Sequence, residues 1–415
     1  MNDYNLFKHC HVNMNNNDER FVGIKADQGN AIVYFPIGYK LPETEQELRK
    51  DIIHLIYILT TFTKSREGVL SSRDYVKSQS VSYPIHAYLN VVNSYLQSKA
   101  YYMESERKYI VSDHGKTNWS RTIKRQKPMI QQNGTPFYLQ RDVINFTPNG
   151  NNYLTRIHEW CVYEGFARIG WLFTNIMPEK PHIIFQKAKF TEAIKNKLGK
   201  TYNDNEKTLF QSMLSIVNYT DEISERNQMH FGTDRFEYVW ERIIDRIFGV
   251  EDKELYFPKT KWNLLYGSTK MNSYLQPDTV MISDNKIVII DAKYYKYGIT
   301  GNPNDLPGSS SINKQIAYGE YVSISEIVKK KHGDGYQVFN IFIMPFNSSV
   351  NPFNTNSTFL HIGEAIAEWK SNNFSFEHIV GVLVDMRYAM WQCTTKKNSQ
   401  IYELMSEVEH STKYL

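Results

Sequence analysis

The chain contains 415 residues, a length that accommodates two or three domains with separate hydrophobic cores. Its 48 Lys and Arg residues nearly balance its 44 Asp and Glu residues, and the net charge of +4 excludes a histone-like or tail-driven electrostatic binder. The mean hydropathy is −0.50, and no run approaches the roughly 18 apolar residues that cross a bilayer. Aromatic residues make up 14% of the chain, which favours packed sheets or stacking surfaces over disorder.

Cysteine usage and the N-terminus indicate the compartment. The three cysteines, Cys10, Cys161 and Cys393, are odd in number and widely spaced, which favours reduced thiols over a disulfide framework. The first 20 residues lack the basic segment and apolar run of a signal peptide. We therefore expect a cytoplasmic globular protein.

The first half of the chain predicts short strands followed by helices. Strands are expected at residues 21–25 and 31–35, and helices at 44–64, 85–99 and 153–176. Thr44 and Glu47 have the spacing of a capping box, which marks the start of the first helix.

The second half changes to a regular α/β order. Two polar stretches, residues 195–207 and 218–227, are candidate boundaries, and we divide the chain into residues 1–225 and 226–415. After the boundary we expect a helix at 233–248, an extended segment near residue 264, a hairpin at 278–295, a helix at 312–329, and strands at 337–344 and 379–386. This order predicts a compact α/β unit.

The hairpin brings chemically useful side chains together. Two β-rich runs, TVMI and KIVII, flank a polar turn, and with Asp284 and Asn285 as turn residues Asp278 lies directly opposite Asp291. Side chains of opposed residues share one face of the sheet, with Cβ atoms about 5 Å apart. Lys293, two residues beyond Asp291, shares that face. One register therefore gathers two carboxylates and an amine.

These three residues predict a metal-dependent hydrolytic site. Opposed like charges destabilise a sheet unless something neutralises them, and two carboxylates suit Mg²⁺. Asp278 and Asp291 would bind the cation, and Lys293 would stabilise developing negative charge or orient a water nucleophile. The alternative is that the two aspartates are solvated residues at a sheet edge.

The same residues resemble a nuclease signature. Pro277-Asp278 followed by Asp291-Ala292-Lys293 resembles the PD-(D/E)XK motif, written here as PD-x12-DAK. The resemblance implies an α/β, restriction-endonuclease-like core in residues 226–415, with a mixed sheet flanked by helices. It leaves residues 1–225 as an N-terminal α+β region for DNA binding and target recognition.

The resemblance also implies further site residues. The family usually contributes an acid from the helix before the sheet, and Glu237 and Glu241 are four residues apart on one helix face, so either could reach the metal. The alternative is that both are solvated helix acids. The implied metal set is Asp278, Asp291 and Glu241, holding one or two Mg²⁺ ions that Mn²⁺ can replace. Gln315, on the helix after the lysine, would hold a water or contact the phosphate.

A basic segment is the best candidate for phosphate contact. Residues 115–127 contain five Lys or Arg residues and no acid, together with an aromatic residue that can stack. The alternative is a solvated basic loop. The predicted DNA-binding residues are Lys116, Trp119, Arg121, Lys124, Arg125 and Lys127.

The amino-acid sequence of this segment extends the resemblance to both halves of the chain. GKTNW-x-RTIK, FEYVWE and PDTVMI…DAKYY resemble restriction endonucleases of the LlaJI type over residues 115–321. A weaker similarity to McrC, the nuclease subunit of McrBC systems, lies in the later motifs. The resemblance implies Mg²⁺-dependent, sequence-specific double-strand cutting of unmethylated DNA, with a methyltransferase on a separate chain.

Three alternatives remain open from the sequence. The chain could be the nuclease subunit of a GTP-dependent McrBC-like system, a structure-specific nuclease of the same fold acting in repair, or a DNA-binding module without catalysis. Neither GKT motif forms a P-loop, because Ile194 and Ile110 occupy the position of the first glycine, so a GTPase would be a separate subunit. Cutting both strands predicts a homodimer or a transient dimer on DNA.

Overall fold

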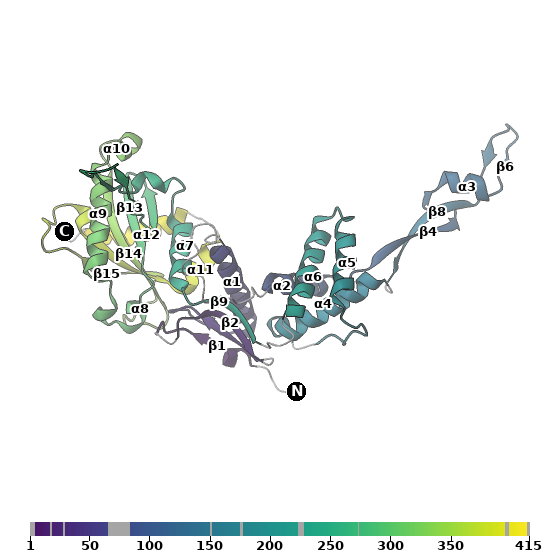
Figure 1. The fold of residues 1–415 in the computed structure, drawn as a ribbon, viewed down its shortest axis with the longest axis horizontal. Helices are drawn as coiled ribbons and strands as arrows, with labels where there is room; N and C mark the ends of the chain where they lie inside the picture. The colour runs from purple at the N-terminus through teal and green to yellow at the C-terminus, as the bar shows by residue number, and fades with distance from the viewer. Residues whose placement is uncertain are drawn as a thin grey trace. The chain divides into compact units, whose positions relative to one another are not determined.

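The computed structural model describes residues 5–16, 19–27, 30–64, 84–149, 152–174, 177–222, 228–272, 274–394 and 398–412. The chain forms two compact units, both mixed α/β (Figure 1). Unit 1 comprises Met1–Val81 and Gln228–Leu415, and unit 2 comprises Ser82–Asn227.

Unit 1 differs from the two-part division expected from the sequence because the start of the chain joins the C-terminal half. Its first sheet has the order β1-β3-β2-β9, and β9 pairs antiparallel with β2, so strands from both segments of unit 1 share one sheet. The strands are β1 (Cys10–Val12), β2 (Val22–Asp27), β3 (Asn30–Phe35) and β9 (Gln228–Thr233). The break between the units lies beside the predicted boundary at 225, whereas residues 1–81 belong with the later segment.

The central sheet of unit 1 has five strands in the order β12-β13-β14-β16-β15. The inner strands β13, β14 and β16 are parallel, and the edge strands β12 and β15 run antiparallel to their neighbours. Residues 287–290 of β13 are each at most 1% exposed, as expected for a strand covered on both faces. The bounds are β12 (Thr279–Ser283), β13 (Lys286–Ala292), β14 (Gln337–Phe346), β15 (Phe359–Ala365) and β16 (Ile379–Asp385).

Helices cover this sheet on both sides (Figure 1). On one face, Tyr318 and Val322 of α9 pack against Ile287 and Ile289 of β13. The helix expected at 312–329 is divided, because α9 ends before Ser325 and α10 begins after it. The helices of unit 1 are α1 (Glu45–Lys64), α7 (Phe236–Phe248), α8 (Tyr297–Thr300), α9 (Ser309–Ile324), α10 (Glu326–His332), α11 (Met386–Gln392) and α12 (Asn398–Thr412).

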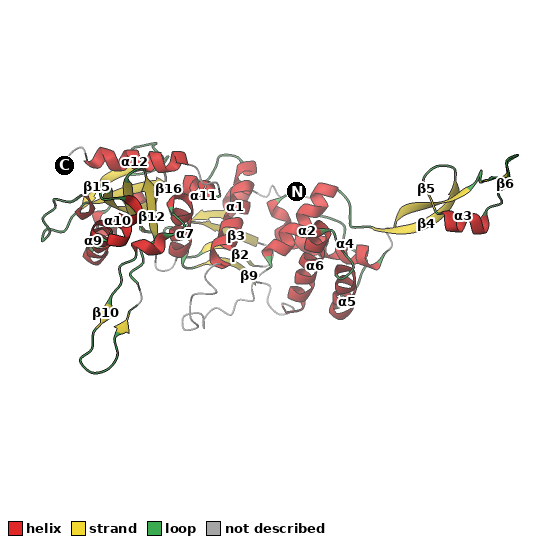
Figure 2. Ribbon diagram, turned by 90° about the horizontal axis from the view of Figure 1, so that it is seen from above, coloured by secondary structure: helices red, strands yellow, loops and turns green. Residues whose placement is uncertain are grey.

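Short elements complete unit 1. The 3-10 helices are η1 (Leu6–His9), η3 (Lys253–Tyr256), η4 (Pro303–Asp305) and η5 (Ser375–Glu377), and β10 (Lys261–Trp262) pairs with β11 (Lys270–Met271) in a small hairpin (Figure 2). The expected start of α1 is confirmed, since the Glu47 N–H donates to the Thr44 hydroxyl at 3.3 Å.

Unit 2 combines a helical core with a long two-stranded arm. The helices are α2 (Ile85–Ser98), α4 (Tyr153–Ile169), α5 (Lys187–Leu198) and α6 (Asp204–Glu222), and their buried faces supply Val91, Ile157, Phe190 and Phe210. The polar stretch 195–207, a candidate boundary, instead joins α5 to α6 within this unit. The helix expected at 153–176 ends earlier, at Gly170, where 3-10 helix η2 (Gly170–Leu172) follows.

The arm consists of strands β4 (Glu104–Ser112) and β8 (Arg141–Asn149), which pair antiparallel along their whole length. The polypeptide between them folds at the end of the arm where Ser112 pairs with Arg141. It forms β5 (Lys116–Thr117), α3 (Trp119–Arg125), β6 (Met129–Ile130) and β7 (Pro136–Phe137) (Figure 1).

Two sequence expectations concern the chain as a whole. Within the described ranges, no helix has the length and apolar character needed to cross a membrane. Cys10, Cys161 and Cys393 are buried free thiols, as expected.

Candidate active site

The β12–β13 hairpin has the register that the sequence predicts. Thr279 pairs with Ile290 and Ser283 pairs with Lys286, which leaves Asp284 and Asn285 as the turn. Asp284 has a φ of +49°, a left-handed conformation that Asp tolerates better than most residues. If this register continues by one residue beyond the Thr279–Ile290 pair, Asp278 lies opposite Asp291.

The two carboxylates and the lysine meet at the edge of the sheet where the parallel strands end. Asp291 is only 5% exposed, and its Oδ2 lies 2.7 Å from the Lys293 Nζ. Asp278, half-buried, accepts a hydrogen bond from the Ala292 N–H through Oδ2 at 3.0 Å. The Lys293 N–H donates to the Ile343 carbonyl at 2.8 Å, which fixes the backbone of the lysine to β14.

Burial and neighbouring negative charges together set the electrostatics of Asp278. Burial raises the pKa of Asp278 well above its usual range, and the adjacent Asp291 carboxyl and the nearby Glu241 raise it further. The Ala292 N–H opposes the shift by stabilising the carboxylate. A carboxyl in this position holds a proton at neutral pH unless a cation replaces it.

The structure separates the two candidate helix acids. Glu241 lines a pocket of about 490 Å³ together with Asp278, and it contributes to the raised pKa of that residue. Glu237, one turn earlier on α7, instead lies near Tyr294. Burial raises the pKa of Tyr294, and the negative charge of Glu237 adds to this effect. The pocket therefore brings Glu241 to the aspartate pair and leaves Glu237 outside it.

The donor set fits a hard divalent cation that keeps part of its hydration. Asp278 and Asp291 offer two close carboxylates whose mutual repulsion a cation would relieve. In the described part of the chain, no three His, Cys, Asp or Glu side chains gather closely enough to hold a metal by themselves. Glu241 thus acts on the pair from the pocket wall, and two carboxylates with water or phosphate oxygens match the usual coordination of Mg²⁺.

Sequence reasoning missed three residues around the pair. The Lys253 Nζ lies 2.8 Å from both the Asp245 Oδ1 and the Asp278 carbonyl, so it anchors the start of β12 to α7. Asp245 lies four residues after Glu241, a spacing that could have revealed it. The Tyr318 hydroxyl donates to the Gln276 carbonyl at 3.2 Å, and burial, assisted by the negative charges of the aspartate pair, raises its pKa.

Gln315 lies in the interior of unit 1. Its side chain is fully buried beneath α9 and its Nε2 donates to the Ile289 carbonyl at 2.8 Å. A second, longer contact of 3.4 Å reaches the Asn340 Oδ1. This geometry makes Gln315 a buried link between α9 and the sheet, and its expected contact with a water or the phosphate stays a prediction.

The N-terminal segment supports the residues that follow the lysine. Tyr294 is 8% exposed, and its hydroxyl accepts a hydrogen bond from the Ile37 N–H at 2.8 Å. The Asn15 side chain donates to the Tyr294 carbonyl at 3.2 Å, and the Lys296 Nζ donates to the Asn16 side chain at 2.8 Å. Residues far away in the sequence therefore hold the backbone next to Lys293.

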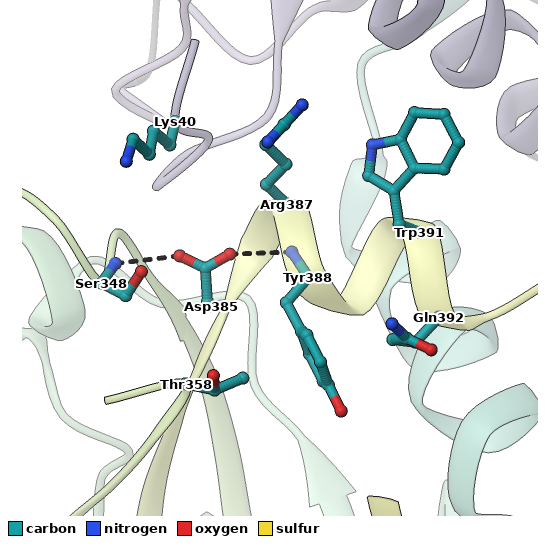
Figure 3. Close-up of a pocket in the computed structure, with 8 residues that line it drawn as sticks. All are labelled: Lys40, Ser348, Thr358, Asp385, Arg387, Tyr388, Trp391 and Gln392. Atoms are coloured by element: carbon teal, nitrogen blue, oxygen red, sulfur yellow. Dashed lines mark hydrogen bonds between the residues drawn. The ribbon is translucent and has the colours of Figure 1, made fainter. Parts of the chain in front are cut away.

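A second pocket, of about 470 Å³, lies at the ends of β14 and β16 (Figure 3). Asp385 accepts hydrogen bonds from the Tyr388 N–H at 2.7 Å and the Ser348 N–H at 2.9 Å, which caps α11. Arg387 contacts both carboxylate oxygens of the buried Asp51, at 2.8 and 3.2 Å. These side chains are engaged in joining α11 to α1 and to the loop after β14.

The predicted DNA-binding residues all lie at the end of the arm in unit 2. Lys116, Lys124, Arg125 and Lys127 are exposed, and Trp119 is 53% exposed. Arg121 differs, because its Nε lies 3.5 Å from the buried Asp142 carboxylate and its guanidinium stacks 4.5 Å above the Tyr109 ring. Of the predicted residues, four cations and an indole thus face solvent, and Arg121 is used within the arm.

Comparison with known proteins agrees with the resemblance seen in the sequence. Similar solved structures include a Thermococcus gammatolerans assembly of McrB AAA+ hexamers with bound McrC, at 15% identity and TM-score 0.33, covering 90% of this chain and 82% of that chain. Another is the McrBC complex of the same organism, at 17% identity and TM-score 0.21, covering 55% and 65%. No curated protein gives a significant match. The model of the LlaJI restriction endonuclease family matches residues 21–369, and the chain belongs to this family.

Proposed function

We propose that this chain is an Mg²⁺-dependent endodeoxyribonuclease that hydrolyses phosphodiester bonds in duplex DNA at a PD-(D/E)XK site. The observation that carries the proposal is the opposed Asp278–Asp291 pair, with the Lys293 Nζ 2.7 Å from the buried Asp291, in a chain of a restriction endonuclease family. Two opposed carboxylates are unfavourable as mere edge residues, the pKa of Asp278 is raised, and a functional cation gives a reason for the pair.

The residues take distinct roles in this mechanism. Asp278 and Asp291 would hold the cation, which when bound supplies a Lewis acid that polarises the scissile phosphate. Lys293, held by the Asp291 carboxylate and by its own N–H bond to Ile343, directs its ammonium group to the negative charge that develops on the phosphate. Glu241, on the wall of the same pocket, is placed to orient a water nucleophile or a hydrated cation.

DNA recognition is assigned to the arm of unit 2, where Lys116, Lys124, Arg125 and Lys127 would contact phosphates and Trp119 would stack or position them. We further propose that cutting is sequence-specific, that unmethylated DNA is the substrate, and that a separate methyltransferase protects the host. Cleavage of both strands requires two such sites, hence a dimer formed in solution or on DNA.

An alternative is that the chain is the nuclease subunit of a GTP-dependent system. The residues before both GKT motifs support a separate nucleotide-binding subunit, since Ile194 and Ile110 replace the first P-loop glycine. In that case the purified chain binds DNA but cuts only when a GTPase partner and GTP are supplied.

Digestion of unmethylated phage DNA with Mg²⁺, with and without GTP, followed by mapping of the ends tests the proposal. Asp291→Ala and Lys293→Ala should retain DNA binding and lose cleavage by at least about 100-fold, the usual effect of removing one preorganised charged group. Glu254→Gln, an exposed carboxylate of the same pocket, is the matched control and should cut normally. Wild-type rates in either active-site variant refute the assignment, and cuts at junctions instead of fixed sequences point to a structure-specific nuclease.

A further inference from the structure

A small hairpin precedes the catalytic strand β12 and projects from unit 1 (Figure 2). Its strands β10 and β11 pair Lys261 with Met271 and Trp262 with Lys270. Two bonds extend the ladder toward its base, from the Asn272 N–H to the Thr260 carbonyl at 3.0 Å and from the Leu275 N–H to the Pro258 carbonyl at 3.1 Å. We call residues 258–275 the β10–β11 hairpin.

The hairpin presents large apolar side chains to solvent. Leu265 and Tyr266 at its tip are 95% and 93% exposed, and Trp262 is 61% exposed. Exposed apolar side chains grouped on one projecting element are unusual for a protein surface without a binding role. Such side chains on this hairpin therefore indicate a contact surface.

The charged side chains of the hairpin are all positive. Residues 255–277 include Lys259, Lys261 and Lys270 and no Asp or Glu, in a chain whose overall charge is nearly balanced. All three lysines are exposed, and the Lys259 ammonium lies 5.0 Å from the centre of the Tyr274 ring. A surface of lysines and aromatic residues is complementary to a polyanion that carries planar apolar groups.

Both ends of the hairpin are built into the rim of the carboxylate pocket. Phe257, directly before it, and Gln276 and Pro277, directly after it, line the same pocket as Asp278. The Tyr318 hydroxyl bonds the Gln276 carbonyl, which fixes this end to α9. A DNA strand whose phosphate reaches Asp278 therefore passes the base of the hairpin.

We propose that the β10–β11 hairpin enters a groove of the substrate duplex beside the scissile phosphate. This inference rests on the proposed nuclease function and specifies how the duplex is held. A two-stranded ribbon fits the major groove, where lysines reach the phosphates on either side and apolar side chains contact base edges. Lys259, Lys261 and Lys270 supply the phosphate contacts, and Trp262 and Tyr266 face the bases.

A second copy of this chain is the competing occupant of the apolar surface. Two such hairpins brought together would confront three lysines with three lysines without any acid between residues 255 and 277 to compensate. DNA supplies the opposite charge along with apolar base edges, so the duplex fits better.

A salt titration of duplex binding tests the proposal in full-length protein carrying Asp291→Ala, so that binding is measured without cleavage. The hairpin variant combines Lys259→Ala, Lys261→Ala and Lys270→Ala. The control combines Lys8→Ala, Lys50→Ala and Lys330→Ala, three exposed lysines on other elements of unit 1 that change the net charge equally. Each lost phosphate contact lowers the slope of log K against log salt by about 0.9.

The expected result is a slope about 2.7 smaller for the hairpin variant and an unchanged slope for the control. Between 50 and 200 mM salt the parent protein should then lose about 40-fold more affinity than the hairpin variant. Equal slopes for the two triple variants overturn the inference and leave the proposed nuclease function standing. A parent protein that binds no duplex overturns both.

Photocrosslinking gives a second measurement that does not depend on removing charge. The three native cysteines are buried, so a crosslinker attaches selectively to Leu265→Cys at the hairpin tip. Ile324→Cys, at the exposed end of α9, is the control. Crosslinks to DNA from the tip and not from α9 support the inference, whereas crosslinks from the tip to another copy of the chain refute it.

Discussion

Replacing Asp278 with asparagine tests the electrostatic reasoning about the site without relying on activity. Asp278→Asn keeps an oxygen that accepts from the Ala292 N–H, bonded at 3.0 Å, and removes the carboxyl that must hold a proton to lie beside Asp291 and Glu241. In the metal-free protein, we expect the substitution to stabilise unit 1 at neutral pH, because the carboxyl it removes holds a proton in the folded state that the unfolded chain releases.

The sign and size follow from proton linkage. A carboxyl whose folded pKa lies above its unfolded value of 3.8 stabilises the fold while both states are protonated, and this stability is lost as pH rises toward the folded pKa. Each pH unit costs about 1.4 kcal/mol, so the ceiling at pH 7 is about 4 kcal/mol. If relaxation of the surroundings halves this value, about 2 kcal/mol remains, which corresponds to a Tm increase of roughly 4–8 °C.

Thermal unfolding in EDTA at pH values from 5 to 8 measures this effect. The Tm difference between Asp278→Asn and wild type should grow with pH, and Mg²⁺ should stabilise the wild type more than the variant. Glu254→Gln, exposed on the same pocket, should show neither effect. A difference that does not change with pH, or that matches the control, refutes the raised pKa of Asp278.

Two further substitutions test the surroundings of the site and the arm. Tyr294→Phe removes the hydroxyl that accepts from the buried Ile37 N–H at 2.8 Å, so it should destabilise unit 1 by about 1–3 kcal/mol in urea unfolding. In cleavage kinetics it should lower kcat more than it changes KM. Tyr295→Phe, at a more exposed position, is the control and should have neither effect. Lys124→Ala with Arg125→Ala should reduce the salt slope of DNA binding by about 1.8 without lowering Tm, and an unchanged slope removes these residues from the phosphate contacts.

Sequence reasoning succeeded where the determinants are local. The β12–β13 register follows from a two-residue turn and the alternation of side chains, so the opposition of Asp278 and Asp291 could be worked out from neighbouring residues. Glu237 and Glu241 could not be separated in this way, because both lie on one face of α7. Only the packing of that helix against the sheet brings Glu241 to the pocket.

The features that the sequence did not reveal depend on partners that are distant in the chain. Gln315 has an ordinary position on a helix pattern, and its burial depends on how closely α9 approaches β13 and β14: a Cβ at Gly319, one turn later, would meet the Asn340 side chain at 2.5 Å. Likewise, no local sequence pattern in residues 1–81 predicts that β2 pairs with β9, some 200 residues later. Both outcomes depend on tertiary contacts that periodicity does not encode.

The pairing of β2 with β9 makes a prediction about truncation. A fragment of residues 226–415, the nuclease region drawn from sequence alone, lacks the partner of β9, the Ile37 N–H that bonds Tyr294 and the α1 helix that carries Asp51. It should therefore show broad, weakly cooperative unfolding and no cleavage.

A chain that joins residue 81 to residue 228 through a flexible Gly-Ser linker retains both segments of unit 1 and should unfold cooperatively. Circular dichroism melts of the two proteins measure the difference. Cooperative unfolding of the 226–415 fragment at the temperature of the linked protein refutes a structural contribution of residues 1–81. Loss of structure in both would mean instead that unit 2 is needed to fold unit 1. The expected contrast requires the first strands and the β12–β13 hairpin to form one cooperative unit, because the Lys293 N–H bonds β14 while the next residue, Tyr294, bonds the N-terminal segment.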